Sequence, residues 1–351
     1  MLYFKLENGQ DLAAAAQAMT DGKKAFRIWE GDTARTYDRR GLCTACENSQ
    51  ADADAVALRP DMDADALRNA HRIAAARETV RTKERRAADL LAMYEKPGIM
   101  LDYVRRELLA LVNVAYHSSG KIEGCHSVDG CASCEFCQKM ISAAGCNPLM
   151  ICGSCYAARD AWKEIAWRTH TLNARILSTV LFTAEELATL ALGALCRINE
   201  DGDTVNDIHA RNILRIILTH PHTHFGYWYK NAPAVAAGLA AEGYTDRASL
   251  PDNVRFVHSS ALIGFRVRPC WFDDYTFTVY PDAATVAEAV AAGAWECNGR
   301  RCRECKYHCY TGPRTAEVID TAELLRCSKP DRVRILAAYW DRRRQQESRQ
   351  A

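Results

Sequence analysis

Hydrophobic and polar positions follow a helical period in the first third of the chain. Residues 63–96 are rich in Ala, Arg, Leu and Glu and contain neither Gly nor Pro, which predicts one long helix that ends before Pro97. Residues 100–116 place apolar side chains on one face and predict a second helix. Residues 1–40 contain short alternating runs on either side of an alanine-rich stretch, so we expect a small strand, helix and strand there. The N-terminal region is therefore predicted to be largely helical.

After residue 160 the pattern changes to short apolar runs separated by helical stretches. A helix is predicted over residues 162–180, and Thr183 with Glu186 has the sequence of a capping box that begins another. The strand-like runs that follow are 194–199, 223–229, 254–260 and 276–280. Strands that alternate with helices usually pair in parallel through right-handed crossovers. We therefore predict an α/β fold whose centre is a partial, open β/α barrel of about four or five strands.

These patterns divide the 351 residues into four regions. We expect a small α/β unit with a long helix in residues 1–120 and a cysteine-rich cluster-binding segment in residues 121–160. The partial barrel is expected over residues 161–312, where it ends in a cysteine loop, and a C-terminal helix over residues 313–351. A chain of this length suffices for two domains, or for one large domain with an appendage.

The charge balance excludes recognition that depends on the charge of the whole protein. Lys and Arg number 45 against 44 Asp and Glu, a formal net charge of +1, so no overall field favours nucleic acid, an acidic partner or a membrane. Basic residues at 81–86 and 342–344 could contact a phosphate backbone, but a solvated helix face with internal charge pairs is the favoured interpretation. The opening MLYFKLENGQ lacks the features of a signal peptide, and no apolar run reaches the roughly 18 residues of a spanning helix. We expect a cytoplasmic protein without membrane contact.

Sixteen cysteines are unusual for such a protein, because a reducing cytoplasm does not maintain disulfides. Three isolated ones, Cys196, Cys270 and Cys327, are expected to be buried like small hydrophobic residues. The other thirteen are clustered, which indicates metal binding. They are Cys43, Cys46, Cys125, Cys131, Cys134, Cys137, Cys146, Cys152, Cys155, Cys297, Cys302, Cys305 and Cys309.

The last cluster places four thiols within one short loop, with four, two and three residues between successive cysteines from Cys297 to Cys309. Such spacings let one loop wrap a [4Fe-4S] cluster. Structural zinc more often uses two Cys-x2-Cys pairs separated by a dozen or more residues. Basic residues in the same loop would offset the negative charge of a thiolate-ligated cluster. We therefore favour iron and sulfide over zinc, which is the alternative metal.

The middle segment holds seven cysteines between residues 125 and 155, more than one site needs. The run Cys131, Cys134 and Cys137 matches the start of a bacterial-ferredoxin motif, whose fourth ligand commonly comes from elsewhere in the chain. The candidates for that fourth ligand are Cys125, Cys146, the pair Cys43 and Cys46, and His126. The number of clustered cysteines predicts two or three [4Fe-4S] clusters and does not assign cysteines to them.

Functional side chains of parallel sheets lie in the loops beyond the carboxyl ends of the strands. Asp201 and Asp203 occupy such a position after the run 194–199. A ligand-binding role and an ordinary solvated turn explain this acidic loop equally well. The three histidines of the turn HPHTH, residues 220–224, fit a solvated turn better than a metal site.

Five phrases of the sequence carry a family resemblance. They are GCNPLMICGSCYAARD, RINEDGD, THFGYWYKN, TFTVYPDA and WECNGRRCRECKYHCY. Over about residues 140–312 they resemble, in this order, a family of cysteine-rich phage and mobile-element proteins known as gene product 88. That family is distantly similar to radical S-adenosylmethionine enzymes, whose partial β/α barrels hold a [4Fe-4S] cluster on three cysteines.

This resemblance implies a cofactor-binding set made of Cys146, Cys152 and Cys155, with one iron of a [4Fe-4S] cluster open to S-adenosylmethionine. Their spacing of five and two residues departs from the usual three and two. Asp201 and Asp203 would receive the methionine ammonium group and are the predicted catalytic residues. The six cysteines between 43 and 137 fall outside the family pattern and would form an additional cluster for electron delivery.

Two hypotheses from different classes follow. The first is an iron-sulfur enzyme, redox or radical-based, of phage or mobile-element origin, with an electron donor such as ferredoxin or flavodoxin as its partner. The second is a non-enzymatic iron-sulfur protein with structural or redox-sensing clusters that binds nucleic acid or a host protein. A cluster iron without a protein ligand would favour the first, and full cysteine ligation beside a contiguous basic surface would favour the second.

Overall fold

The computed structural model of the chain separates into two compact units. One comprises residues 1–88 and 159–169, and the other residues 89–158 and 170–351. Each unit is described by itself. The residues that the structure describes are 2–6, 25–30, 33–38, 43–45, 64–96, 101–118, 120–130, 147–151, 164–200, 202–297, 302–305, 309–312, 314–315, 317–325 and 329–350.

The first unit contains a four-stranded sheet and most of a long helix. The strands are β1 (Leu2–Leu6), β2 (Ala25–Glu30), β3 (Thr33–Asp38) and β4 (Cys43–Ala45), and they pair in chain order. β1 and β2 are parallel, whereas β3 and β4 continue the sheet antiparallel. Helix α3 (Ala64–Tyr94) confirms the helix predicted over residues 63–96. A bidentate ion pair from Arg168 to Glu84, at 2.7 and 3.0 Å, lies within this unit.

The second unit is built on an eight-stranded sheet, counted over the described residues. Its order is β11-β12-β10-β9-β8-β7-β6-β5, and every neighbouring pair is parallel except β5 with β6. The strands are β5 (Ala115–Tyr116), β6 (His126–Val128), β7 (Leu195–Ile198), β8 (His224–Tyr229), β9 (Val254–Ser259), β10 (Tyr275–Tyr280), β11 (Trp295–Glu296) and β12 (Ile319–Leu324). This mostly parallel sheet confirms the predicted α/β class.

The sheet has more strands than the four or five expected. The predicted strands correspond to β7, β8, β9 and β10, and the additional ones come from both ends of the chain. β5 and β6 precede residue 161, and β12 follows residue 312, so the sheet extends past both boundaries predicted for the barrel. Strands of two or three residues are too short to show an alternation of apolar and polar positions. The sequence pattern therefore does not predict β5, β6 and β11.

The helices of this unit begin and end close to the predicted positions, except that the helix expected over residues 100–116 is shorter and the one expected over residues 313–351 begins only at Lys329, after strand β12. They are α4 (Leu101–Leu109), α7 (Glu164–Thr179, partly in the first unit), α8 (Ala184–Leu187), α9 (Asp207–Thr219), α10 (Ala232–Ala241), α11 (Ala283–Ala291) and α12 (Lys329–Gln350). The capping box is confirmed, because the Glu186 N–H donates to Thr183 Oγ1 and the Thr183 N–H to Glu186 Oε2. None of the helices in the described ranges has the length and apolar character to cross a membrane.

The predicted helix over residues 100–116 is too long. It ends at Leu109, and its last two residues form strand β5 instead. The buried amide of Asn173 explains the change, because it accepts from the Asn113 N–H at 2.7 Å and donates to the Asn113 carbonyl at 2.8 Å. Both backbone groups of Asn113 are thereby satisfied outside a helix.

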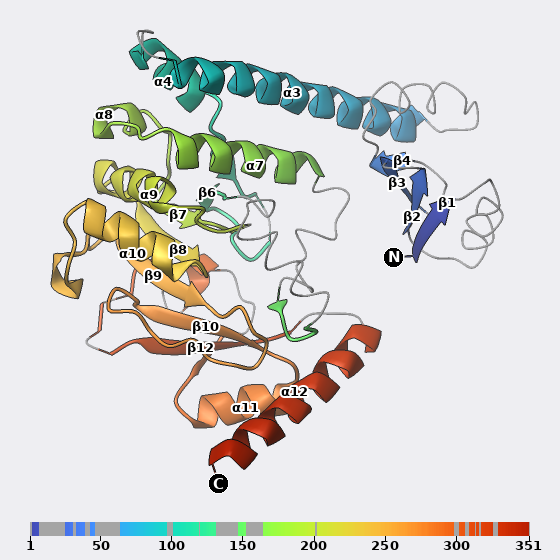
Figure 1. Ribbon diagram of the computed structural model, residues 1–351, viewed down its shortest axis with the longest axis vertical. Helices are drawn as coiled ribbons and strands as arrows, with labels where there is room; N and C mark the ends of the chain where they lie inside the picture. Colours follow the sequence, from blue (N-terminus) through green and yellow to red (C-terminus); the bar gives the residue numbers. More distant parts are fainter. Residues whose placement is uncertain are drawn as a thin grey trace. The chain divides into compact units, whose positions relative to one another are not determined.

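The two faces of the sheet carry different structures (Figure 1). Figure 1 shows α8, α9 and α10 one after another beside strands β7 to β9. On one face Tyr227 contacts Phe256, and Phe256 contacts Phe272 from the β9–β10 connection, with ring centroids 5.5 and 5.9 Å apart. The opposite face carries Trp228, Val257, Tyr275 and Phe277, which pack against two cysteines of the 297–309 loop. The cysteine loop is therefore part of the packed structure of the sheet.

Candidate metal centre at the cysteine loop

The backbone holds the cysteine loop at three places. The Cys297 N–H donates to the carbonyl of Ala322 in β12 at 2.7 Å, directly after β11 ends. The Cys302 N–H donates to the Lys121 carbonyl at 2.7 Å and begins a short 3-10 helix, Cys302–Glu304. The Cys305 N–H donates to the Cys302 carbonyl at 3.2 Å. These bonds fix the directions in which three of the four thiols leave the chain.

The absence of a side chain at Gly226 lets the end of the loop approach the sheet. A Cβ atom at this position of β8 would lie 3.1 Å from a ring carbon of Tyr310 and 3.4 Å from the Cys309 carbonyl oxygen. Both distances are at or below ordinary van der Waals contact. Glycine is therefore required here for close packing, although its backbone needs no special conformation.

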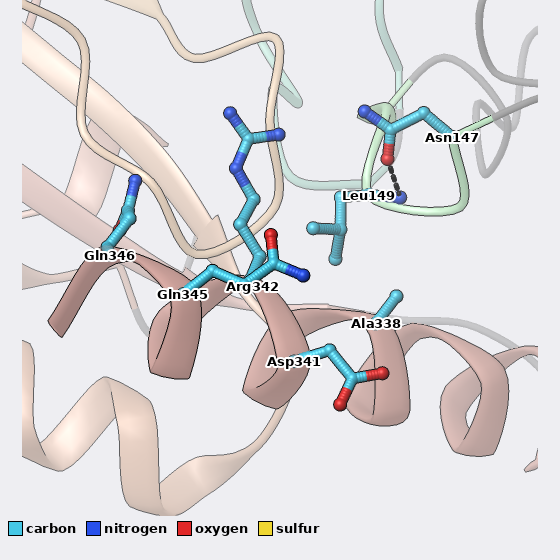
Figure 2. A pocket seen from close by; sticks show the side chains of 7 residues that line it. All are labelled: Asn147, Leu149, Ala338, Asp341, Arg342, Gln345 and Gln346. Atoms are coloured by element: carbon cyan, nitrogen blue, oxygen red, sulfur yellow. Dashed lines mark hydrogen bonds between the residues drawn. The ribbon is translucent and has the colours of Figure 1, made fainter. Parts of the chain in front are cut away.

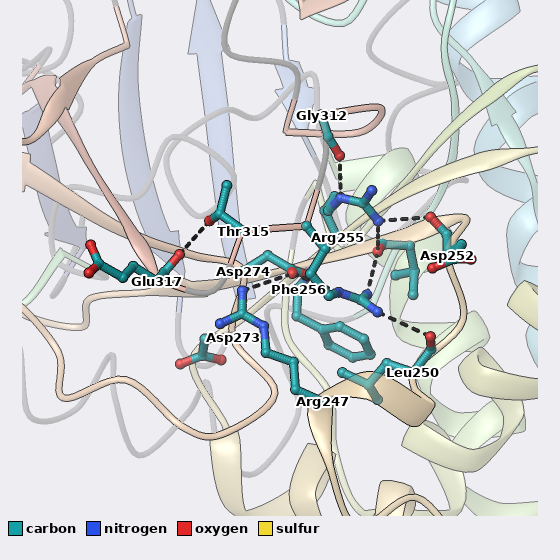
Figure 3. Close-up of polar contacts among 12 residues, drawn as sticks. Arg247, Leu250, Asp252, Arg255, Phe256, Asp273, Asp274, Gly312, Thr315 and Glu317 are labelled. Atoms are coloured by element: carbon teal, nitrogen blue, oxygen red, sulfur yellow. Dashed lines mark hydrogen bonds and ion pairs between the residues drawn. The ribbon is translucent and has the colours of Figure 1, made fainter.

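Arginine side chains fasten the segment that follows the loop (Figure 3). Arg255 Nε donates to the Gly312 carbonyl at 2.6 Å, and Arg314 Nε donates to Asp274 Oδ1 at 2.9 Å. Arg314 also donates to the carbonyls of Leu250, Pro251 and Val254. The Asp274 side chain is 2% exposed and also accepts from Arg247, so these are buried, charge-assisted bonds. The cysteine loop thus lies between two well-anchored points, β11 and this arginine cluster.

The four thiols of the loop face a common space. Burial, followed by the neighbouring thiols of Cys302, Cys297 and Cys305 in that order, raises the pKa of Cys309 to about 12. Burial likewise raises the pKa of Cys302, which Arg197 and Lys121 oppose. Thiols that influence one another in this way lie in one neighbourhood, and their role as ligands of a cluster stays a prediction. Without a metal, Cys309 is protonated at neutral pH, and a metal would have to displace that proton.

Two cations border this group of thiols. Lys121 donates to Glu323 Oε2 at 2.8 Å. Burial by itself lowers the pKa of Lys121, but the negative charges of Glu323 and Cys297 outweigh burial, so the pKa is raised. The Arg197 guanidinium lies 4.3 Å from the centre of the Trp228 ring, and its charge acts on Cys302, Cys309 and Tyr310. Positive charges beside thiolates stabilise the ionised form that metals require. Neither Lys121 nor Arg197 was among the residues predicted from the sequence, because both are distant from the loop along the chain.

The remaining predicted ligands are only partly described. Cys43 lies in β4, and Cys125 is fully buried and interacts with Cys196 and Tyr310. The predicted ligands Cys46, Cys131, Cys134, Cys137, Cys146, Cys152 and Cys155 lie outside the described residues. Of the isolated cysteines, Cys196 is fully buried as expected and Cys270 is half-buried, whereas Cys327 lies outside the described residues.

Asp203, a predicted catalytic residue, is 1% exposed. Its carboxylate accepts from the N–H groups of Thr204 at 2.7 Å, Lys230 at 2.9 Å and Asn231 at 3.3 Å. Burial raises the pKa of Asp203, and the charge of Lys230 and these backbone bonds oppose the rise. These hydrogen bonds join the loops after β7 and β8, so Asp203 has a structural role. Asp201 lies outside the described residues, so the catalytic role of the pair stays a prediction.

The basic side chains considered for phosphate binding make internal contacts where their partners are described. Arg85 pairs with Glu78 at 2.9 Å, Arg343 pairs with Glu288 at 2.7 Å, and Arg344 pairs with Asp341. Arg342 lies 5.0 Å from the centre of the Phe265 ring. These pairs favour the predicted solvated helix face with internal charge pairs.

A cavity of about 540 Å³ lies between α12 and the turn at Asn147 (Figure 2). Its lining consists of Asn147, Leu149, Ala338, Asp341, Arg342, Gln345 and Gln346. This mixture of amides, one carboxylate and one guanidinium contains no thiol or imidazole.

A second buried polar group lies on the opposite face of the sheet. Asp273 accepts from Tyr229 Oη, from the Cys270 N–H at 2.7 Å and from His258 Nδ1 at 3.1 Å. The Tyr229 ring stacks on that of His258 with centroids 5.2 Å apart. These contacts satisfy Asp273 and tie the β9–β10 connection to the ends of β8 and β9, so we assign this group a structural role.

Comparisons of the chain with protein-family models, with curated proteins and with solved structures each find no match. The assignment of function therefore depends on the geometry and chemistry of the chain itself. The resemblance to the gene product 88 proteins stays a prediction.

Proposed function

We propose that this chain is an iron-sulfur protein and that Cys297, Cys302, Cys305 and Cys309 ligate a [4Fe-4S] cluster. The observation that carries the proposal is the convergence of these four thiols on one space, bordered by Lys121 and Arg197. Four thiolates and two nearby cations suit a negatively charged, thiolate-ligated cluster. When bound, such a cluster accepts and donates single electrons.

The separation of the thiols supports a cluster over a single zinc ion. Four thiolates on one tetrahedral zinc, each about 2.3 Å from the metal, lie about 3.8 Å from one another. Among the described residues, no three of these sulfur atoms lie within 4.8 Å of one another. A [4Fe-4S] cubane is a larger object, because each of its four irons takes one thiolate. Zinc is the competing metal in the experiment below.

The remaining predictions form the wider proposal. A second or third cluster would use the cysteines of residues 43–155, and the sheet would form a partial β/α barrel around them. In a radical enzyme, Cys146, Cys152 and Cys155 would hold the cluster that binds S-adenosylmethionine, while ferredoxin or flavodoxin supplied the electron. The cluster at 297–309, with four cysteines of its own, would then have an electron-transfer or structural role. A non-enzymatic iron-sulfur protein that binds nucleic acid or a host protein is the second candidate, and the complete set of four thiols favours it.

Metal analysis of anaerobically purified protein tests the proposal. We expect iron and acid-labile sulfide in equal amounts, and Cys305→Ser should lose about the content of one cluster. Cys270→Ser is the matched control, because Cys270 is half-buried and stands outside the loop. Circular dichroism of both variants shows whether they fold. Stoichiometric zinc without sulfide, or an unchanged iron content in folded Cys305→Ser, would refute the assignment.

Electron paramagnetic resonance separates the two candidate functions. If S-adenosylmethionine alters the spectrum of the reduced protein, one cluster iron is open to it and the radical mechanism is supported. A spectrum that S-adenosylmethionine leaves unchanged supports the electron-transfer or structural role.

A further inference from the structure

We propose that His117, Asp129 and Glu200 bind one divalent transition-metal ion, with His170 next to Asp129, at a site separate from the cysteine loop. The residues come from four segments of the second unit: the hairpin at β5, the ends of β6 and β7, and helix α7. This site goes beyond the proposed iron-sulfur function and does not depend on it.

Two carboxylates of the site lie at one edge of the sheet. β6 and β7 are parallel with Val128 opposite Ile198, so Asp129 and Glu200 both follow the carboxyl ends of their strands. In open α/β sheets, ligands bind at this edge. The Glu200 N–H donates to Asp129 Oδ1 at 2.6 Å, which holds the two residues side by side.

Asn199 directs Glu200 toward Asp129. Its backbone has φ of 59°, in the left-handed region that asparagine tolerates better than most residues. Its side chain accepts from the Gly130 N–H at 3.0 Å and donates to the Trp228 carbonyl at 2.9 Å. The chain therefore turns sharply after β7, and a buried amide holds the turn in place.

The potential ligand atoms are separated by distances that a single ion requires. His117 Nε2 lies 3.3 Å from Glu200 Oε2, and His170 Nε2 lies 3.6 Å from Asp129 Oδ2. One ligand atom each of His117, Asp129 and Glu200 lie within 4.8 Å of one another. Two ligands each about 2.1 Å from a metal are about 3.0 Å apart at a right angle and about 3.4 Å apart at a tetrahedral angle. Small side-chain movements would therefore close these atoms around an ion.

Neighbouring groups already orient the ligands. Ser127, fully buried, donates to Asp129 Oδ2 at 2.5 Å, and its hydroxyl lies 2.8 Å from His117 Nε2. The hairpin fixes His117 through its own backbone, because its N–H donates to the Cys125 carbonyl at 3.0 Å and its carbonyl accepts from Gly124 at 2.7 Å. The backbone bonds fix the position of His117, whereas the Ser127 hydroxyl contacts Nε2 itself, so a bound ion would have to replace that contact.

The charges and exposure of the site also suit a cation. The Asp129 side chain is 1% exposed. The carboxylate of Glu200 beside this buried carboxylate is unfavourable unless a positive charge lies between the two. The side chains of His117 and Glu200 are 22% and 23% exposed, which leaves a route from solvent. An imidazole and two carboxylates are donors that suit Mn²⁺, Fe²⁺ and Zn²⁺, whereas the cysteine loop offers the softer thiolates that iron-sulfur clusters use. The alternative is a hydrogen-bonded group without a metal.

A manganese titration of the full-length chain distinguishes a metal site from a hydrogen-bonded group without a metal. Protein is exchanged into metal-free buffer, its residual metals are measured, and the resonance signal of free Mn²⁺ reports how much added ion is bound. We expect one saturable site per chain. Glu200→Gln, which keeps the size of the side chain and removes its charge, should weaken binding at least about ten-fold. Glu317→Gln is the control, because Glu317 is exposed and its described contact is through its backbone carbonyl.

Measuring both Mn²⁺ binding and iron and sulfide content in two variants separates this site from the proposed cluster. Glu200→Gln should retain the iron and sulfide of the wild-type protein, and Cys305→Ser should retain Mn²⁺ binding. Absence of saturable Mn²⁺ binding by wild-type protein free of residual metal would overturn the inference. Equal binding by Glu200→Gln and Glu317→Gln would overturn it as well.

Discussion

The buried imidazole of His209 makes a quantitative prediction for the stability of the fold. His209 lies in the first turn of α9, is 1% exposed, and accepts from the Val205 N–H through Nδ1 at 3.2 Å. Burial lowers the pKa of His209 to about 4, because the charged form cannot be hydrated there. In the unfolded chain the same side chain has a pKa of about 6.5.

The sign and size of the effect follow from these two pKa values. Between pH 6.5 and pH 4 the unfolded chain binds a proton at His209 that the folded chain does not bind, so the free energy of unfolding falls as the pH falls through this window. The full effect is about 3 kcal/mol, at about 1.4 kcal/mol for each pKa unit. Between pH 7 and pH 5 the loss is about 2 kcal/mol.

Urea unfolding of wild-type protein and His209→Asn at pH 7 and pH 5 tests this prediction. Asparagine retains a side-chain acceptor but does not titrate, so other ionisable groups and any bound metal cancel in the difference between the two proteins. Wild type should lose about 2 kcal/mol more than His209→Asn on acidification. His222→Asn, at an exposed histidine, should behave as wild type. Equal losses in wild type and His209→Asn would refute a buried neutral imidazole.

Two glycines test the packing on either face of the sheet. Gly226→Val should push Tyr310 and Cys309 away from β8 and lower the iron content per chain, since a Cβ there already lies 3.1 Å from Tyr310; unchanged metal content would show that the loop does not need this contact. Gly238→Ala would place a Cβ 2.4 Å from that of Ala210, where α10 crosses α9. It should lower the free energy of unfolding by about 1–3 kcal/mol, and an unchanged urea midpoint would contradict the close approach of the two helices.

Features that depend on neighbours in the sequence were predictable. The helix over residues 63–96 and the four strands β7 to β10 have periods long enough to recognise, and the capping box at Thr183 is a local hydrogen-bonding pattern. The convergence of Cys297, Cys302, Cys305 and Cys309 also follows from spacing alone, because thiols two to four residues apart cannot separate far. The sequence by itself therefore determined the α/β class and that these four cysteines lie near one another.

Features that depend on distant parts of the chain were decided by the tertiary structure. The amide of Asn173 ends the helix that the pattern extends to residue 116. β6 is a strand because it pairs with β7, and β5 is a strand because it pairs with β6. Lys121 and Arg197 border the cysteine loop although they lie a hundred residues or more before it in sequence. Asp129 and Glu200 come together because the ends of parallel strands β6 and β7 meet at one edge of the sheet, and the β5 hairpin and helix α7 bring His117 and His170 beside them. The spacing of these residues along the chain does not predict that they are neighbours.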